Sequence, residues 1–338
     1  MPKEALSYLE AIDKFSSYFS SDDDLYIGSF YEFIRDVWAY GFSRPEEFAL
    51  RYVELICNDV EDMLNKPLDN KYYCATLPRG MRKSSILGYG FCVYRLLDMK
   101  VDVTIPYISY SEAMAMKHTT EIKRHIRSNP KLSFMIDRAP QSDSSCRYSV
   151  GGRYIEVDPM GLFSFKRGTH SDGGALCDDL LPDPENVLNL SEILKVSDHF
   201  FKETIYIPNK GAPLIVLGTP MVPGDLLTLL PTDERFFTRV LPALNPMPLE
   251  YPDWEVLAPE IRDKEWLLRE QRAHPAAFAA EFMLAPYSTG QAYITDDEIK
   301  LVENPKLKSL DPHEYHDLDS DFTFAAMDIG KKRHPTHI

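Results

Sequence analysis

The sequence has no hydrophobic run long enough to cross a membrane. A spanning helix takes about 20 consecutive apolar residues, and no run in the 338 residues approaches that length. The N-terminus, MPKEALSYLEAIDKF, is acidic and amphipathic and lacks the apolar centre of a signal peptide. These absences predict a soluble, intracellular protein without a membrane partner.

Cysteine is scarce and is not spaced for metal binding. The sequence has five cysteines, an odd number, and no C-x-x-C pair of the kind that zinc and redox sites use. Most have apolar neighbours, which predicts small core residues in a reducing compartment. They are Cys57, Cys74, Cys92, Cys146 and Cys177.

Positive charge is in deficit. The 37 Lys and Arg residues face 52 Asp and Glu residues, and the formal net charge is −15. This balance argues against a surface that coats nucleic acid passively. Any contact with DNA is expected to be local or transient, or to be made by a partner or another part of the protein.

The periodicity of apolar residues indicates three regions. Residues 1–65 carry apolar side chains at spacings of three and four, which predicts amphipathic helices that pack in a core. Residues 66–225 alternate strand and helix patterns, which predicts a mainly parallel sheet with helices on both faces. Beyond residue 225, prolines cluster and two helical patterns follow, as expected for a small helical appendage.

The most informative segment is residues 77–85, LPRGMRKSS, which lies between an apolar strand pattern and a helical pattern. It has the frame of a nucleotide phosphate loop, G-x-x-x-x-G-K-[ST]. Lys83 and Ser84 keep their places, but Leu77 and Arg82 replace the two glycines. In such a loop, backbone N–H groups and the lysine bind phosphate, and the hydroxyl binds Mg²⁺.

The remaining loop residues leave two interpretations open. Gly80 can take a positive φ, and Arg79 and Arg82 are expected to add charge beside the same anion. The alternative is a basic turn that caps a helix and binds no nucleotide.

A second candidate site follows the apolar residues 175–177. In open α/β sheets, ligands bind at the carboxyl ends of strands, and this strand ends in Asp178 and Asp179. In phosphoryl-transfer enzymes one such carboxylate lies near Mg²⁺ and another orients or deprotonates the attacking group. We therefore expect Asp178 to bind the metal and Asp179 the water. The alternative is a solvated pair that opens a loop with Asp183 and Glu185.

A third candidate is Thr219, which follows the strand pattern ending at Gly218. Its hydroxyl can sense the γ-phosphate and transmit its loss, although threonine after a strand is also ordinary turn chemistry. The order Lys83, Asp178-Asp179, Thr219 predicts one sheet with three functional strand ends.

Together these segments resemble the large terminase subunit of tailed bacteriophages, in its N-terminal ATPase part. The resemblance runs in order over roughly residues 70–330. Its components are the deviant phosphate loop (77–85), the Walker B strand with the following helix (174–201), the coupling motif (214–230), an F-x-x-x-[FY]-x-x-x-P segment (274–286) and the first strand of an RNase H-like nuclease (322–330).

The resemblance implies an α/β fold of the ASCE-type P-loop NTPases, with a mainly parallel sheet flanked by helices. The domains would be an N-terminal helical segment (1–65), a P-loop ATPase core (66–225), a lid or linker subdomain (226–315) and a linker with a truncated nuclease strand (316–338). Ten residues follow Asp328, and none is Asp or Glu. We therefore expect a fragment without nuclease activity.

The activity implied is Mg²⁺-dependent ATP hydrolysis that translocates double-stranded DNA into a procapsid, in the host cell cytoplasm. The implied partners are DNA, the portal protein, the small terminase subunit and further copies in a ring. The alternatives are another P-loop ATPase, of helicase-like or DNA-repair type, and a non-catalytic assembly module with a decayed loop.

The resemblance also implies a role for each site residue. Arg82 stands where the family usually has Gly or Ala, so the loop must close without the backbone freedom of a small residue at this position. Arg79 would act on the γ-phosphate, with Arg138 or Arg167 as alternative fingers in trans. Catalytic roles fall to Asp179, Arg79 and Thr219, nucleotide binding to Arg79, Gly80, Met81, Arg82, Lys83, Ser84 and Ser85, and Mg²⁺ binding to Ser84 and Asp178.

Overall fold

The computed structural model describes residues 17–18, 26, 28–67, 71–99, 101–132, 135, 145–150, 153–164, 168–181, 190–245 and 255–286. All of them belong to one compact unit, Met1–Thr289. In this part of the chain, no helix has both the length and the apolar character that a membrane span requires. Several predicted positions lie outside the described residues: Arg138, Arg167, Asp183, Glu185, and the nuclease strand with Asp328.

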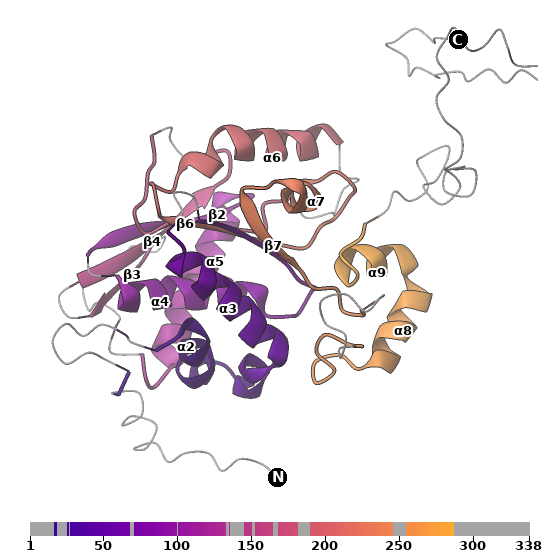
Figure 1. Cartoon of the computed structure of the whole chain (residues 1–338), viewed down its shortest axis with the longest axis horizontal. Coiled ribbons are helices and arrows are strands. Elements are labelled where there is room, and N and C mark those ends of the chain that lie inside the picture. The colour runs from indigo at the N-terminus through magenta and orange to yellow at the C-terminus, as the bar shows by residue number, and fades with distance from the viewer. Residues whose placement is uncertain are drawn as a thin grey trace, which may run out of the picture. The chain divides into compact units, whose positions relative to one another are not determined.

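A seven-stranded sheet organises the fold, in the order β3-β4-β2-β5-β6-β1-β7 (Figure 1). Every neighbouring pair is parallel except β3 and β4. This confirms the predicted α/β class with a mainly parallel sheet. The strands are β1 (Lys71–Thr76), β2 (Val103–Ser109), β3 (Cys146–Val150), β4 (Arg153–Gly161), β5 (Ala175–Asp178), β6 (Pro213–Gly218) and β7 (Phe236–Val240).

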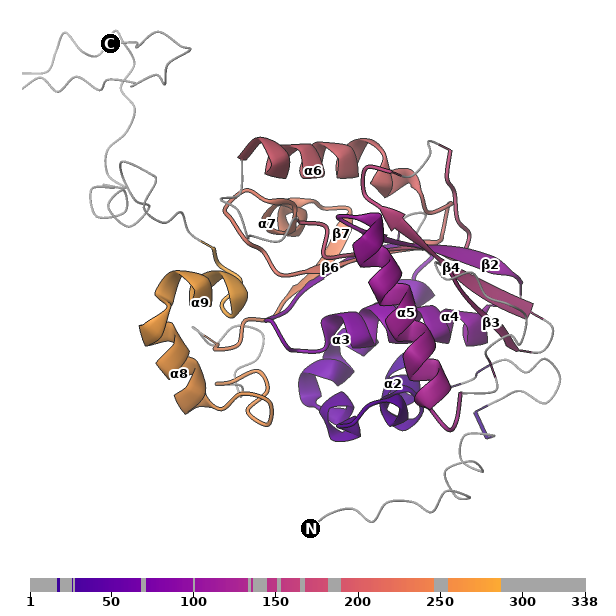
Figure 2. The same ribbon diagram turned by 180° about the vertical axis from the view of Figure 1, so that it is seen from behind.

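Helices cover both faces of the sheet (Figures 1 and 2). One face carries α2 (Phe30–Asp36), α3 (Arg51–Asn65), α4 (Phe91–Asp98) and α5 (Glu112–Ser128). The other carries α6 (Leu190–Lys202) and α7 (Leu226–Leu229). After β7 come α8 (Lys264–Ala273) and α9 (Pro275–Glu281), and short helical turns span Trp38–Gly41, Pro45–Ala49, Ser84–Gly90, Thr204–Tyr206 and Leu230–Thr232.

The alternation of side chains along the strands creates two cores. In β1, Tyr73 and Ala75 pack toward α2 to α5, whereas Tyr72 and Cys74 pack toward α6 and α7. A third, smaller core joins α8 and α9 through Leu267 and Phe278. All five cysteines are buried and free, as the sequence predicted.

The sheet extends further along the chain than the sequence indicated. β7 pairs in parallel with β1, from Tyr72 opposite Phe236 to Thr76 opposite Val240. The expected core of residues 66–225 therefore leaves out an edge strand. Because β7 is short and lies in a proline-rich stretch, its pattern alone does not distinguish it from a loop.

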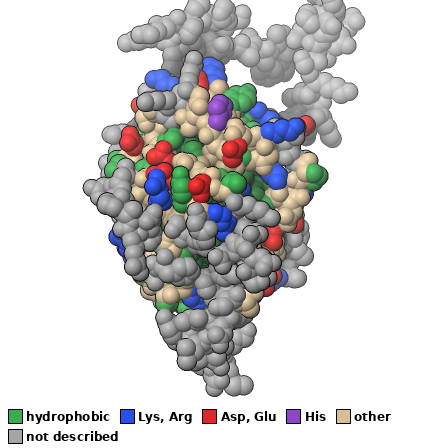
Figure 3. Space-filling view, turned by 90° about the vertical axis from the view of Figure 1, so that its left-hand side faces the viewer, with side chains coloured by type: hydrophobic (Ala, Val, Ile, Leu, Met, Phe, Trp, Pro, Cys, Tyr) green, Lys and Arg blue, Asp and Glu red, His purple; other side chains and the backbone are tan. Residues whose placement is uncertain are grey.

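Acidic and basic side chains are mixed on the surface near β3 and β4. On the face drawn in Figure 3, the described Lys and Arg side chains lie among Asp and Glu side chains and do not form one basic patch. This agrees with the acidic net charge of the sequence.

Candidate nucleotide-binding site

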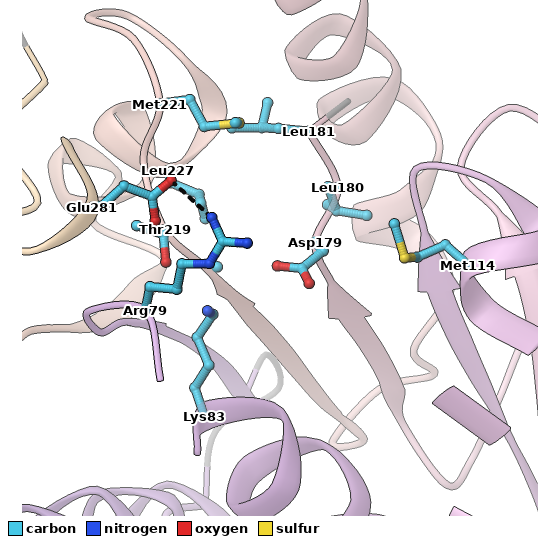
Figure 4. A pocket seen from close by; sticks show the side chains of 11 residues that line it. Arg79, Lys83, Met114, Asp179, Leu180, Leu181, Thr219, Met221, Leu227 and Glu281 are labelled. Carbon is cyan, nitrogen blue, oxygen red and sulfur yellow. Dashed lines mark ion pairs between the residues drawn. The ribbon is translucent and has the colours of Figure 1, made fainter. Parts of the chain in front are cut away.

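The ends of β1, β5 and β6 meet at one pocket. These strands are adjacent and parallel, with Thr76 opposite Gly218 and Asp178 opposite Leu217, so their carboxyl ends share one edge of the sheet. A pocket of about 180 Å³ lies at this edge (Figure 4). Its lining consists of Arg79, Lys83, Met114, Asp179, Leu180, Leu181, Gly218, Thr219, Met221, Leu227 and Glu281.

The pocket contains only part of the predicted site. Arg79, Lys83, Asp179 and Thr219 line it, and Figure 4 shows Arg79, Lys83 and Asp179 directed toward one another. These residues come from segments about a hundred positions apart, so folding assembles the cluster. Gly80, Met81, Arg82, Ser84, Ser85 and Asp178 lie outside the lining.

The loop closes although it lacks the usual glycines. Gly80 takes a φ of 86°, as expected, and Arg82 also lies in the left-handed region, with a φ of 54°. This conformation costs a residue other than glycine roughly 1–2 kcal/mol. The backbone of Arg82 therefore adopts a glycine-like conformation, and other contacts must hold it there.

The side chain of Arg82 does not add charge to the pocket, contrary to the expectation from sequence. Its Nε lies 2.6 Å from Oε2 of Glu47, and its guanidinium stacks 5.9 Å from the ring centroids of Phe42 and Phe48. Burial alone would raise the pKa of Glu47, but hydrogen bonds from Arg82 and Arg44 outweigh it and hold that pKa below its ordinary value. The charge of Arg82 is thus paired outside the pocket.

The N-terminal helices also hold the backbone of the loop. Trp38 donates from Nε1 to the carbonyl oxygen of Ser85 at 2.7 Å, and the Tyr52 hydroxyl donates to the carbonyl oxygen of Met81 at 3.1 Å. The sequence predicted only a core role for this segment, because amphipathic periodicity does not indicate which loop a buried polar atom will contact.

Asp179 is positioned by its backbone. Its φ is 52°, and its carbonyl oxygen accepts a hydrogen bond from the N–H of Tyr110 at 3.1 Å. Burial, followed by the nearby charge of Asp178, raises the pKa of Asp179, and the charges of Lys83 and Arg79 oppose this only in part. The site thus holds a carboxylate with increased proton affinity beside two cations.

Asp178 lies outside the pocket lining and is fully buried. Its Oδ2 accepts a 2.7 Å hydrogen bond from the hydroxyl of Tyr107 and lies 3.9 Å from Nδ1 of His118. That Nδ1 is 2.8 Å from the hydroxyl of Tyr89. Burial, then the charge of Asp178, raises the pKa of Tyr107 well above its ordinary value, so the phenol remains protonated and donates.

Two further pocket residues, Thr219 and Glu281, link the phosphate loop to other elements. Thr219 donates from Oγ1 to the carbonyl oxygen of Leu77 at 3.0 Å, which joins the end of β6 to the start of the loop. The N–H of Arg79 donates to the carbonyl oxygen of Glu281 at 3.1 Å, and its guanidinium lies 3.7 Å from the carboxylate of Glu281 (Figure 4). Glu281 belongs to α9, and no sequence pattern indicated a role for it.

The residues fit a nucleotide-bound magnesium ion better than an isolated metal. Among the described residues, no group of three or more His, Cys, Asp or Glu side chains is placed to hold an ion. Mg²⁺ bound with a nucleotide keeps several waters and uses one or two carboxylates plus phosphate oxygens. Oδ1 of Asp178 is buried without a hydrogen-bond partner, so one oxygen of this carboxylate is not engaged by the described residues, although it lies outside the pocket lining.

Neither a protein-family model nor a curated protein matches the chain by sequence. Solved structures of phage large terminases are similar to it. The HK97 bacteriophage large terminase is 14% identical, with a TM-score of 0.48 over 70% of this chain and 50% of that one. The large terminase of a thermophilic bacteriophage in complex with ATP-γ-S is 11% identical, with a TM-score of 0.41 over 67% and 51%. A mutant ATPase domain of the Thermus phage P74-26 large terminase is 13% identical, with a TM-score of 0.40 over 64% and 89%. The chain spans about half the length of the first two structures.

Proposed function

We propose that the chain is the ATPase part of a phage large terminase, which hydrolyses ATP to move double-stranded DNA into a procapsid. One observation carries the proposal. The lysine of the phosphate loop, the second aspartate after β5 and the threonine after β6 line one pocket at the carboxyl edge of a mainly parallel sheet. Such an edge is where open α/β sheets bind ligands.

Phosphate binding would fall to the loop between β1 and the turn Ser84–Gly90. Lys83 would neutralise the β- and γ-phosphates, and backbone N–H groups of the loop would bind their oxygens. The N–H of Met81 would not be among them, because it donates to the carbonyl oxygen of Pro78 at 3.3 Å. Ser84 and Asp178 would hold Mg²⁺, which would neutralise charge on the phosphates when bound. The unpartnered Oδ1 of Asp178 supports this assignment.

Hydrolysis would depend on Asp179 and Arg79. Asp179 would orient the attacking water and accept its proton, and its raised pKa favours that role because a base works best when its pKa approaches the working pH. Arg79 would stabilise the charge on the γ-phosphoryl group in the transition state. When the γ-phosphoryl group leaves, Thr219 would transmit the change between the phosphate loop and β6 through its hydrogen bond to the carbonyl oxygen of Leu77.

The larger assembly belongs to the same proposal. Residues 1–65 and 66–225 would form the helical segment and the ATPase core, 226–315 the lid subdomain, and 316–338 the start of a nuclease domain. DNA, the portal protein, the small terminase subunit and a ring of copies in the host cytoplasm would be the partners. The chemistry of the pocket suits ATP hydrolysis, and the proposal assigns no nuclease activity to this chain.

ATP hydrolysis by the wild-type chain and two variants tests the proposal. Lys83→Ala should abolish binding of ATP-γ-S with Mg²⁺, whereas Asp179→Asn should keep binding and lose hydrolysis. Lys195→Ala, at an exposed position on α6, is the matched control and should behave as wild type. Equal hydrolysis by Lys83→Ala and Lys195→Ala would contradict the assignment.

The alternatives predict different results. A decayed, non-catalytic module would show no hydrolysis in the wild type, with or without procapsid and partner proteins. A helicase-like or repair ATPase would hydrolyse ATP but would not package DNA. In a packaging assay, a motor requires that the full-length wild-type protein package DNA and that Asp179→Asn in the same protein fail to do so.

A further inference from the structure

The phosphate loop has an arginine at the position that requires a left-handed conformation. Arg82 has a φ of 54°, and both its Nε and its Nη2 lie 2.6 Å from Oε2 of Glu47. Glu47 is 7% exposed and lies in the turn Pro45–Ala49, 35 residues before its partner. A charge-assisted pair of this length is among the stronger hydrogen-bonding arrangements in proteins.

The same N-terminal segment contacts the loop at two further points. Tyr52 binds the carbonyl oxygen of Met81, the residue before Arg82. Trp38 binds the carbonyl oxygen of Ser85, three residues after it. The ion pair therefore lies between two backbone contacts from a separate part of the chain, so all three restrain one short stretch of loop.

We propose that Glu47 is a positioning residue for the nucleotide site, which holds the phosphate loop in its closed conformation through Arg82. The inference rests on the proposed function, because it assumes that the loop binds phosphate. A glycine at position 82 would allow this conformation but would not select it. The Glu47–Arg82 pair selects it before the ligand arrives, and such preorganisation lowers the cost of binding.

The surroundings of Glu47 make the pair specific. Arg44 also contacts its carboxylate, at 3.0 Å through Oε1, so each carboxylate oxygen has an arginine partner. Phe42 and Phe48 lie close to the guanidinium of Arg82 and limit its alternative positions. Loss of Glu47 would leave this guanidinium without its carboxylate, and removing one partner of a largely buried pair is costly.

Glu47→Gln tests the inference against Glu46→Gln, the same change at an exposed neighbour in the same turn. Glu47→Gln should weaken binding of ATP-γ-S with Mg²⁺ about tenfold, or about 1.4 kcal/mol. KM for ATP should rise to a similar extent, with kcat changed less than about threefold because Asp179 and Arg79 stay in place. Wild-type binding by Glu47→Gln, or equal losses in both variants, would overturn the proposal.

Arg82→Gly and a double variant provide the second test. Arg82→Gly suits the backbone but removes the pair, so it should weaken binding as Glu47→Gln does. The double variant Glu47→Gln/Arg82→Gly should be no weaker than either single variant, because all three lack the same interaction. Wild-type binding by Arg82→Gly, or additive losses in the double variant, would overturn the inference.

Hydrogen exchange of the loop amides separates this inference from the proposed function. Residues 79–86 should exchange faster in Glu47→Gln than in wild type or Glu46→Gln, without any nucleotide present. If the wild type binds no ATP-γ-S but shows this difference, the proposed function fails and the positioning role of Glu47 stands. Unchanged exchange would count against the positioning role even if ATP binds.

Discussion

The hydroxyl of Tyr107 donates a 2.7 Å hydrogen bond to Oδ2 of Asp178, and both side chains are fully buried. The two residues lie on neighbouring parallel strands, β2 and β5. A strand that carries no residue of the proposed nucleotide site therefore orients the carboxylate proposed to hold Mg²⁺.

Tyr107→Phe should destabilise the protein. The change removes the donor and leaves a buried carboxylate oxygen without it, which costs roughly 1–3 kcal/mol. Denaturant unfolding of the variant measures the loss. Tyr206→Phe, at a position 61% exposed, is the control and should leave stability unchanged. Equal stability of the two variants would show that the hydrogen bond does not matter.

Asp179→Asn should stabilise the fold at neutral pH while it abolishes hydrolysis. Because the pKa of Asp179 is raised by burial and by Asp178, ionisation of this group favours the unfolded chain. The protonated carboxyl of Asp179 leaves stability intact at low pH, and this stability is lost as the pH rises through the raised pKa of the folded state. Thermal unfolding at pH 8 should give the variant a higher Tm than the wild type. The difference should disappear toward the ordinary Asp pKa of about 3.9, and a constant difference at all pH values would contradict this explanation.

Glu281→Gln should strengthen nucleotide binding. In the structure the guanidinium of Arg79 lies 3.7 Å from the carboxylate of Glu281, and the side chains are 77% and 28% exposed. Phosphate must compete with this ion pair for Arg79. An exposed pair is worth up to about 1 kcal/mol, so the affinity for ATP-γ-S should rise roughly two- to fivefold. Glu265→Gln, at an exposed position on α8, should have no effect.

Acid should open the phosphate loop before it unfolds the protein. The pKa of Glu47 is held below its ordinary value, so the stabilisation it provides is complete above the ordinary Glu pKa of about 4.3 and is lost as the pH falls through the lowered pKa. Amide exchange in residues 79–86, corrected for the intrinsic effect of pH, should increase over that range in the wild type. Glu47→Gln should show no such increase. Identical pH profiles of exchange in the wild type and in Glu47→Gln would argue against a role for Glu47 ionisation in holding the loop.

The strand ends could be predicted from sequence because they depend on local patterns. An apolar run followed by Lys-Ser, by two aspartates or by Gly-Thr indicates where a strand ends, and parallel pairing then brings the ends together. The start of α5 is also a local feature, because serine is a favoured N-cap residue and the Ser111 hydroxyl accepts from the N–H of Met114 at 3.3 Å.

The rest depends on contacts between residues far apart in the chain. The pairing of Arg82 with Glu47, 35 residues away, and of Tyr107 with Asp178, 71 residues away, leaves no local pattern. The sequence pattern therefore placed the charge of Arg82 in the pocket, whereas the fold pairs it with Glu47 outside the pocket. No pattern indicated that Tyr107 would bind Asp178. β7 was missed because it is short, lies in a proline-rich stretch and buries only Phe236 of its five residues, so it leaves no apolar run.

The Glu47–Arg82 pair has a consequence for how related proteins vary. A change at position 82 alone would remove either the left-handed conformation of this residue or the ion pair that restrains it. Positions 47 and 82 should therefore change together in descendants of a common ancestor. Relatives with glycine at position 82 are free to lose the carboxylate at position 47, whereas relatives with arginine should retain it. A search for such loops would therefore gain more from this distant pair of positions than from the spacing of glycines.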